Sequence, residues 1–295
     1  MMKQLVFVHG RAQEQKDAVA LKGEWVGAFR EGLAKSQLQL PISDDAIRFP
    51  YYGQTLYDLV SEVPPDQVAE VIVRGEKADN DERVFMRAVL QEVKHKAGIS
   101  DAQLAEISGQ DVVARGPLNW EWLQGVLKAI DRHVPFASGT SIALATNDVY
   151  QYLNNSGIRD EIESGIMQAM KPDVPTVVVS HSLGTVVSYN LLRREGKTRR
   201  WVVPLYVTLG SPLGVTVIKK RLAPNKHPEC VVKWFNAMDE RDVVALYPLD
   251  AYNFPINPSI ENKRDVQNQT ENRHGISGYL NDKEVAKRIY DALVG

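Results

Sequence analysis

The sequence predicts an α/β fold with a mostly parallel central sheet flanked by helices. Short apolar runs rich in β-branched residues alternate with longer segments whose apolar residues recur at helical spacing. This alternation is typical of a parallel sheet that helices cover on both faces. The chain of 295 residues suits one large domain, or one domain with an insertion. In such sheets ligands bind at the carboxyl ends of the strands.

The first elements follow this pattern from the N-terminus. A strand is predicted over residues 5–8 and leads into a His-Gly dipeptide. Residues 21–33 carry apolar side chains at every fourth position, which predicts an amphipathic helix. A second short strand, residues 46–49, ends at a Pro-Tyr-Tyr-Gly segment.

Between residues 66 and 145 the alternation stops, and only helical segments are predicted. Ser100 and Gln103 form a capping box, which marks the start of one of these helices. We therefore expect a helical lid over residues 66–145, inserted into a core made of residues 1–65 and 146–295. The helices predicted within the lid are residues 82–96, 100–107 and 118–130.

Strands and helices resume after this insertion. A helix over residues 158–170 is stopped by Pro172. The remaining predicted elements are strands over residues 177–179, 202–209 and 231–237, and a final helix over residues 283–293.

One of these strands is followed by a sharp turn with a serine at its tip. The turn reads Ser180-His-Ser182-Leu-Gly184, and apolar residues at helical spacing follow it. This strand, turn and helix are what a nucleophile elbow requires. The usual form is Gly-x-Ser-x-Gly, and Ser180 departs from it only mildly because serine is also small. Free N–H groups and the positive dipole end of the helix face the Ser182 hydroxyl. This hydroxyl can attack a carbonyl carbon once a base removes its proton.

The base is predicted to be His274, one of six histidines. It precedes the final helix in the segment Asn-Arg-His-Gly-Ile-Ser-Gly-Tyr, from which a loop can reach back to the serine. His9 is expected to be a structural residue that holds the loop after the first strand. The other histidines lie in the insertion, directly beside the serine or between prolines, and are weaker candidates: His95, His133, His181 and His227.

A carboxylate must orient this base, and the segment after strand 231–237 offers several. Asp242 is preferred because an apolar segment follows it and can bury the carboxylate beside the imidazole. Asp239, closer to the strand end, is the alternative, ahead of Glu240 and Asp250. The order serine, aspartate, histidine along the chain is the order expected with such an elbow.

The oxyanion that forms during attack needs two backbone N–H donors. One is expected from Leu183, which directly follows the serine. The other is expected from the loop after the first strand, where Gly10 permits a close turn. We assign this second donor to Arg11, with Ala12 as the alternative.

These motifs resemble the α/β-hydrolase superfamily, in its serine esterase and lipase branch. The resemblance covers residues 3–57 and 148–295 approximately, and includes the Phe-Val-His-Gly and Thr-Leu-Gly-Ser-Pro-Leu segments beside the elbow. It implies the α/β-hydrolase fold, the triad of Ser182, Asp242 and His274, and hydrolysis of a carboxylic ester or thioester through an acyl-enzyme. Two alternatives share the fold: an amidase or acyltransferase with the same triad, and a catalytically silent hydrolase-fold binding protein.

The lid is expected to form the acyl pocket and to set the size of the substrate. It enters after the second strand and returns just before the elbow strand, so it can lie over the carboxyl ends of the strands. The apolar residues on which this expectation rests are Val84, Phe85, Val89, Trp120, Trp122, Leu123 and Leu127.

Composition limits the remaining classes of function. The formal net charge of −2 gives no strong field that would recruit nucleic acid or an anionic membrane. A single cysteine, Cys230, excludes internal disulfides and a cysteine zinc cluster. No signal peptide and no membrane segment are predicted, so the cytoplasm is the expected compartment. We expect a small-molecule or lipid acyl ester as substrate, with no cofactor, metal or nucleic-acid partner; the oligomeric state is left open.

Overall fold

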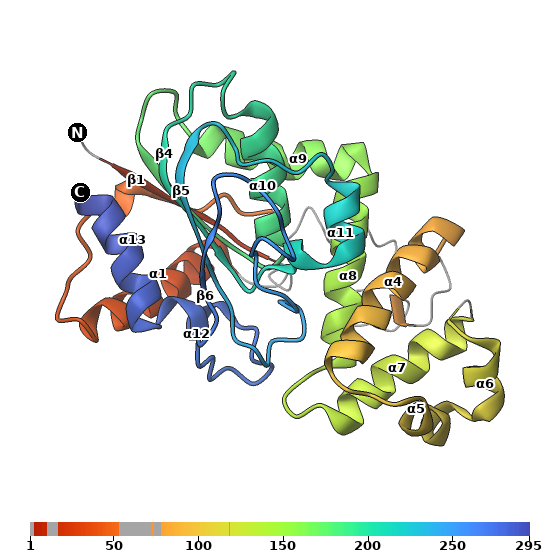
Figure 1. Ribbon diagram of the computed structural model, residues 1–295. Coiled ribbons are helices and arrows are strands. Elements are labelled where there is room, and N and C mark those ends of the chain that lie inside the picture. The colour runs from red at the N-terminus through yellow and green to blue at the C-terminus, as the bar shows by residue number, and fades with distance from the viewer. Residues whose placement is uncertain (1–2, 11–16, 53–71, 74–77, 118) are drawn as a thin grey trace.

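The computed structural model describes residues 3–10, 17–52, 72–73, 78–117 and 119–295. Within this described part, a six-stranded sheet has the order β2-β1-β3-β4-β5-β6, and each neighbouring pair of strands is parallel (Figure 1). The predicted α/β class, with a parallel central sheet flanked by helices, is therefore confirmed. The strands are β1 (Gln4–Val8), β2 (Ile47–Arg48), β3 (Thr176–His181), β4 (Val203–Leu209), β5 (Val231–Ala237) and β6 (Glu261–Lys263).

The register of the sheet aligns the carboxyl ends of its central strands. Val8 of β1 lies opposite Ser180 of β3, which lies opposite Thr208 of β4, and Thr208 lies opposite Asn236 of β5. The segments that leave these four strands therefore begin side by side along one edge of the sheet. This edge is where parallel α/β sheets bind their ligands.

Alternate side chains of the strands enter two separate cores, as the pleat of a strand requires. Val6, Val8 and Val178 pack on one face, whereas Leu5 and Phe7 pack on the other. The face with Leu5 and Phe7 is covered by α1 (Ala18–Ala34), α12 (Ile276–Leu280) and α13 (Lys283–Val294), on the left in Figure 1. The opposite face is covered by α8 (Gly139–Asn154), α9 (Ser156–Ala169), α10 (Leu183–Glu195) and α11 (Thr216–Arg221). Two short 3-10 helices, η1 (Asp44–Ala46) and η2 (Pro212–Gly214), lie in connections.

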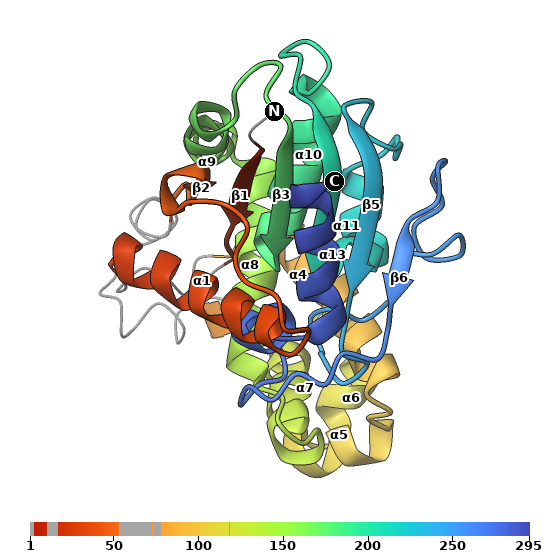
Figure 2. The ribbon, with the colours of Figure 1, turned by 90° about the vertical axis from the view of Figure 1, so that its left-hand side faces the viewer.

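The described residues between 66 and 145 are helices and their connections. They comprise α4 (Asn80–Lys96), α5 (Asp101–Ser108), α6 (Gln110–Arg115), α7 (Trp120–His133) and the first part of α8. The expected boundary at residue 145 thus falls inside a helix that continues into the sheet core. Figures 1 and 2 show α5, α6 and α7 farther from the sheet than α8.

Two polar contacts attach α4 to the sheet core. The Glu92 carboxylate accepts the backbone N–H of Thr216, the first residue of α11, at 3.0 Å. Arg221, at the end of α11, pairs with Asp81 in the first turn of α4 at 2.7 Å. Apolar side chains of α4, such as Phe85, belong to the same core as the sheet residues of that face. The helical segment is therefore packed on the core along α4 and α8.

Candidate active site

Ser182 lies at a sharp turn between β3 and α10. Its backbone has φ 53° and ψ −128°, a conformation that residues other than glycine rarely adopt. The neighbouring glycines allow the turn to pack against the end of β1. A Cβ on Gly184 would lie 2.4 Å from the Val8 carbonyl oxygen, and a Cβ on Gly10 would lie 2.7 Å from Cβ of Ser182. Only residues without a side chain fit at these two positions.

Ser180 occupies the position that is usually glycine in an elbow. Its hydroxyl joins β3 to the neighbouring strand β4 below the turn. This side chain is fully buried and donates to the Val207 carbonyl of β4 at 3.1 Å. Beside it, the Tyr206 hydroxyl contacts Ser188 Oγ at 2.7 Å and donates to the Thr185 carbonyl at 3.0 Å. These bonds join β4 to the first turns of α10, so they support the helix that begins beneath Ser182.

The structure brings together the three side chains that the sequence identifies as a triad. His274 Nδ1 lies 2.7 Å from Asp242 Oδ2, and His274 Nε2 lies 2.8 Å from Ser182 Oγ. A carboxylate can only accept, so Nδ1 carries the proton, and Nε2 is then the acceptor for the serine hydroxyl. Ser182 follows β3, Asp242 follows β5 and His274 precedes α12. The three side chains meet at the carboxyl edge of the sheet.

The Asp242 carboxylate is fully enclosed and saturated with donors. Its Oδ2 accepts from His274 and, at 2.6 Å, from the Tyr279 hydroxyl. Its Oδ1 accepts the backbone N–H groups of Val244 at 2.8 Å and Ala245 at 3.3 Å. Burial alone would raise the pKa of Asp242, but the His274 ring and the hydrogen bonds hold that pKa below its usual value. The carboxylate is therefore ionised while buried beside the imidazole.

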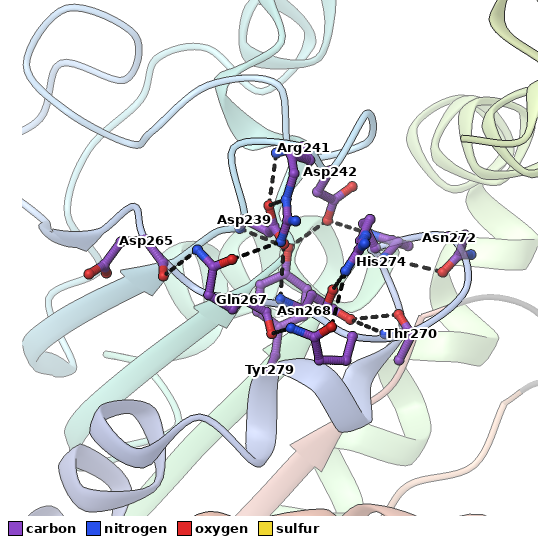
Figure 3. A network of polar contacts seen from close by, with 12 residues as sticks. Asp239, Arg241, Asp242, Asp265, Gln267, Asn268, Thr270, Asn272, His274 and Tyr279 are labelled. Atoms are coloured by element: carbon purple, nitrogen blue, oxygen red, sulfur yellow. Dashed lines mark hydrogen bonds and ion pairs between the residues drawn. The ribbon is translucent and has the colours of Figure 1, made fainter. Parts of the chain in front are cut away.

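Asp239, the alternative acid, faces a different set of partners (Figure 3). It accepts from the Arg241 guanidinium at 2.7 and 2.9 Å and from the backbone N–H of Asn268 at 2.9 Å. The Asn268 amide in turn donates to the Gly275 carbonyl at 2.8 Å, directly after His274. Asp239 thus holds the loop that carries the imidazole, and Asp242 holds the imidazole itself.

Two further histidines, both buried, support the site through the backbone. His9 Nδ1 donates to the Gly10 carbonyl at 2.7 Å, and His9 Nε2 accepts the Tyr52 N–H at 3.0 Å. His181 Nε2 donates to the His274 carbonyl at 2.7 Å, and the two rings lie 4.7 Å apart. Burial lowers the pKa of His9 to about 4 and the pKa of His181 to about 3, so both are neutral near pH 7.

The expected oxyanion donors are only partly described. Leu183 begins α10, so its N–H belongs to the first turn, where the helix offers no carbonyl partner. Arg11 and its alternative Ala12 lie outside the described residues. Gly10, which precedes them, lies against Ser182.

An apolar pocket opens at Ser182. Its walls come from α4, α8, α11 and the segment after Asp242, with Val89, Ala145, Val215 and Leu246 among the lining residues. Among the described residues, no charged side chain lines it. The lining residue Thr146 donates its hydroxyl to the Ile142 carbonyl at 2.7 Å, so this hydroxyl bonds within α8 and does not donate into the pocket.

The pocket differs in detail from the one expected for the lid. Of the seven apolar residues on which that expectation rests, Val89 lines this pocket. Trp122 instead borders a separate hollow beside α4 and α5, and Trp120 donates its ring N–H to the Val73 carbonyl at 2.8 Å. Most of the wall is built from α8 and from segments of the sheet core.

Sequence reasoning missed Tyr279 and Asn268, which contact the site from the segment around His274. Tyr279 lies five residues after His274, and Asn268 lies six residues before it. Proximity along the chain is the one signal that could have pointed to them. Their contacts with Asp242 and Gly275 depend on how the loop folds back under β5.

Comparison with protein-family models, with curated proteins and with solved structures gives no match to this chain. Among the described residues, no group of three or more His, Cys, Asp or Glu side chains is arranged to hold a metal ion. In the same part of the chain, no helix combines the length and apolar character needed to cross a bilayer. The function of this protein is therefore inferred from the geometry around Ser182.

Proposed function

We propose that this protein is a serine hydrolase of the α/β-hydrolase type that cleaves a carboxylic ester or thioester through an acyl-enzyme. The observation that carries the proposal is one imidazole that bridges the Ser182 hydroxyl at 2.8 Å and the buried Asp242 carboxylate at 2.7 Å. A nucleophile, a base and an orienting acid in this geometry define the serine hydrolase mechanism.

In the proposed reaction, Ser182 Oγ bonds to the substrate carbonyl carbon while His274 Nε2 takes the hydroxyl proton. The carbonyl π pair moves to its oxygen and gives a tetrahedral oxyanion. This intermediate collapses, the bond to the leaving oxygen or sulfur breaks, and His274 returns the proton to the leaving alcohol or thiol. Water then attacks the acyl-serine by the same steps, which releases the acid and restores Ser182.

Asp242 keeps His274 in the tautomer that accepts at Nε2, and it stabilises the imidazolium that forms during attack. The neutral His9 and His181 leave no competing positive imidazole beside it. The oxyanion is proposed to bind the Leu183 N–H at the positive end of α10. Arg11 remains the proposed second donor, because it directly follows Gly10, which lies against Ser182.

The apolar pocket at Ser182 is proposed to hold the acyl group. An uncharged acyl chain suits this pocket, because none of its described wall residues carries a charged side chain. The helical segment would then act as a lid through α4 and α8, whose Val89 and Ala145 face this space.

A panel of nitrophenyl esters of increasing acyl length tests the proposal. Ser182→Ala should lower kcat by about 10³-fold or more on every ester that the protein hydrolyses. Ser211→Ala is the matched control, because Ser211 is also buried at a strand end but bonds to Thr185 at 2.8 Å rather than to His274. Comparable activity of Ser182→Ala and the unaltered protein would contradict the proposal.

The same panel separates the alternatives that share a triad. An acyltransferase would transfer the acyl group to an added alcohol or amine faster than to water, and an amidase would favour anilides. A silent binding protein would hydrolyse none of the esters.

A further inference from the structure

The hydroxyl of Tyr279 and the ring of His274 share one oxygen of Asp242. Tyr279 Oη donates to Asp242 Oδ2 at 2.6 Å, and His274 Nδ1 donates to the same atom at 2.7 Å. The backbone N–H of Asp239 donates to the Tyr279 hydroxyl at 3.3 Å. Tyr279 is fully buried on α12, the helix that begins two residues after His274 (Figure 3). The tyrosine is thus a direct partner of the proposed acid.

The backbone at Gly210, which directly follows β4, leaves the space in which these three side chains meet. Gly210 has φ 57°, a conformation that favours glycine. A Cβ there would lie 3.1 Å from Tyr279 Cε2, 3.2 Å from Asp242 Oδ2 and 3.2 Å from His274 Cε1. The close contact of tyrosine, aspartate and histidine therefore depends on the sheet as well as on α12.

We propose that Tyr279 is a positioning residue of the proposed hydrolase, which orients Asp242 and limits how strongly Asp242 stabilises the imidazolium form of His274. A hydroxyl that donates to a carboxylate draws negative charge from the accepting oxygen, and here that oxygen also accepts from His274. It also fixes the rotation of the carboxylate toward the imidazole. The inference rests on the proposed function, because it assigns Asp242 and His274 their roles in that reaction.

Burial and the nearby Asp242 charge keep the Tyr279 hydroxyl protonated, because both raise its pKa well above the usual value. Three further ionisable groups near this cluster, within the described residues, are Asp239, His181 and His9. Asp239 is paired with Arg241 at 2.7 Å, and the imidazoles of His181 and His9 are neutral near pH 7. A change at Tyr279 should therefore act on His274 through Asp242.

Tyr279→Phe tests the inference, because phenylalanine fills the same space without the hydroxyl. NMR of the histidine ring nitrogens follows the titration of His274, whose signals are assigned with His274→Ala. In Tyr279→Phe this titration should move to higher pH by several tenths of a unit. The acidic limb of the kcat profile should move in the same direction. At its optimum kcat should fall about fivefold, whereas KM should stay unchanged because Tyr279 does not line the pocket at Ser182.

Tyr152→Phe is the matched control. Tyr152 is also fully buried and donates to a buried carboxylate, that of Glu163, at 2.7 Å, but this pair does not contact the triad. This control should leave the His274 titration and the pH profile unchanged. An equal shift in both variants, or no shift in Tyr279→Phe, would overturn the inference.

A second replacement keeps the test decisive if Tyr279→Phe does not fold. Site-specific 3-fluorotyrosine at Tyr279 retains the ring and hydroxyl but is a stronger donor, so the His274 titration should move to lower pH. A movement to higher pH, or none, would contradict the proposed role. The NMR measurement requires no turnover, so failure of this inference is distinguishable from failure of the hydrolase proposal. If only the hydrolase proposal fails, the difference between Tyr279→Phe and the unaltered protein is still seen, but esters remain intact.

Discussion

Asp239 and Asp242 lie three residues apart after β5, and each is buried, yet they bind different parts of one loop. Asp242 accepts from the His274 ring, whereas Asp239 accepts from Arg241 and from the Asn268 backbone. One carboxylate therefore faces the imidazole, and the other fixes the loop that carries it. This difference gives the two aspartates distinct expected phenotypes.

Asp242→Asn should lower kcat by about 10⁴-fold, because an asparagine in this position allows the imidazole to adopt the wrong tautomer. Asp239→Asn should mainly weaken the loop, with a loss of about 1–3 kcal/mol in the free energy of unfolding from the unpaired Arg241 and the weakened Asn268 contact. Steady-state kinetics and urea unfolding of both variants provide the measurement. If Asp239→Asn is the catalytically crippled variant, the two roles must be exchanged.

The stability of the protein should fall as the pH is lowered from 7.5 to 5. Burial lowers the pKa of His9 to about 4 and the pKa of His181 to about 3, whereas an unfolded chain holds histidines near their ordinary value. Between these values the unfolded state binds more protons, so the free energy of unfolding rises with pH. Each histidine should contribute a loss of about 2 kcal/mol over this interval.

Urea unfolding at several pH values measures this dependence. His181→Gln removes one of these two imidazoles and should reduce the loss by about 2 kcal/mol. A free energy of unfolding that stays constant between pH 7.5 and 5 would show that these imidazoles are not held neutral by the fold.

His181 should also affect turnover, through its bond to the His274 carbonyl at 2.7 Å. His181→Phe keeps a ring but loses the donor, and kcat should fall about tenfold. His181→Gln places an amide N–H near the position of Nε2 and should retain more activity than the phenylalanine variant. Equal activity of the two variants would argue that the ring contact, and not the hydrogen bond, supports the base.

The sequence predicts residues of the candidate site where the signal is local. A buried β-branched strand, a turn of small residues and an apolar helix stripe together indicated Ser182, and the segments after the last strong strand indicated Asp242 and His274. The short strand β6 was not predicted, because its three residues, Glu261–Lys263, are polar and lie at the edge of the sheet. The contacts of Tyr279 depend on tertiary packing and have no periodic pattern along the chain.

The helical segment likewise contains contacts that depend on tertiary packing and cannot be predicted from the sequence. Its helices α4, α5 and α7 were predicted from apolar spacing and from the capping box at Ser100. Helix α8 was not predicted: it begins at Gly139 and carries buried polar residues such as Asn147. This helix supplies much of the pocket wall, so the sequence could indicate an apolar lid but not the residues that face Ser182.

Ala145 on α8 should therefore control the acyl length that the site accepts. Ala145→Leu adds three carbon atoms to the wall and should shift the preference toward shorter nitrophenyl esters, by about tenfold in the ratio of kcat/KM values. Trp120→Ala is the control, because Trp120 does not line this pocket. The control should leave the ratio unchanged, and a similar change of ratio in both variants would contradict the assignment of the pocket.

His274 is proposed to make the Ser182 hydroxyl nucleophilic, and a fluorophosphonate tests this role without knowledge of the substrate. Attack by Ser182 Oγ on phosphorus forms the O–P bond, releases fluoride and passes the proton to His274. Mass spectrometry of the intact protein and of its peptides should detect one adduct, on the peptide that contains Ser182. The adduct should be absent in Ser182→Ala and should form far more slowly in His274→Ala. No adduct, an adduct on another residue, or an unchanged rate in His274→Ala would contradict this role of His274.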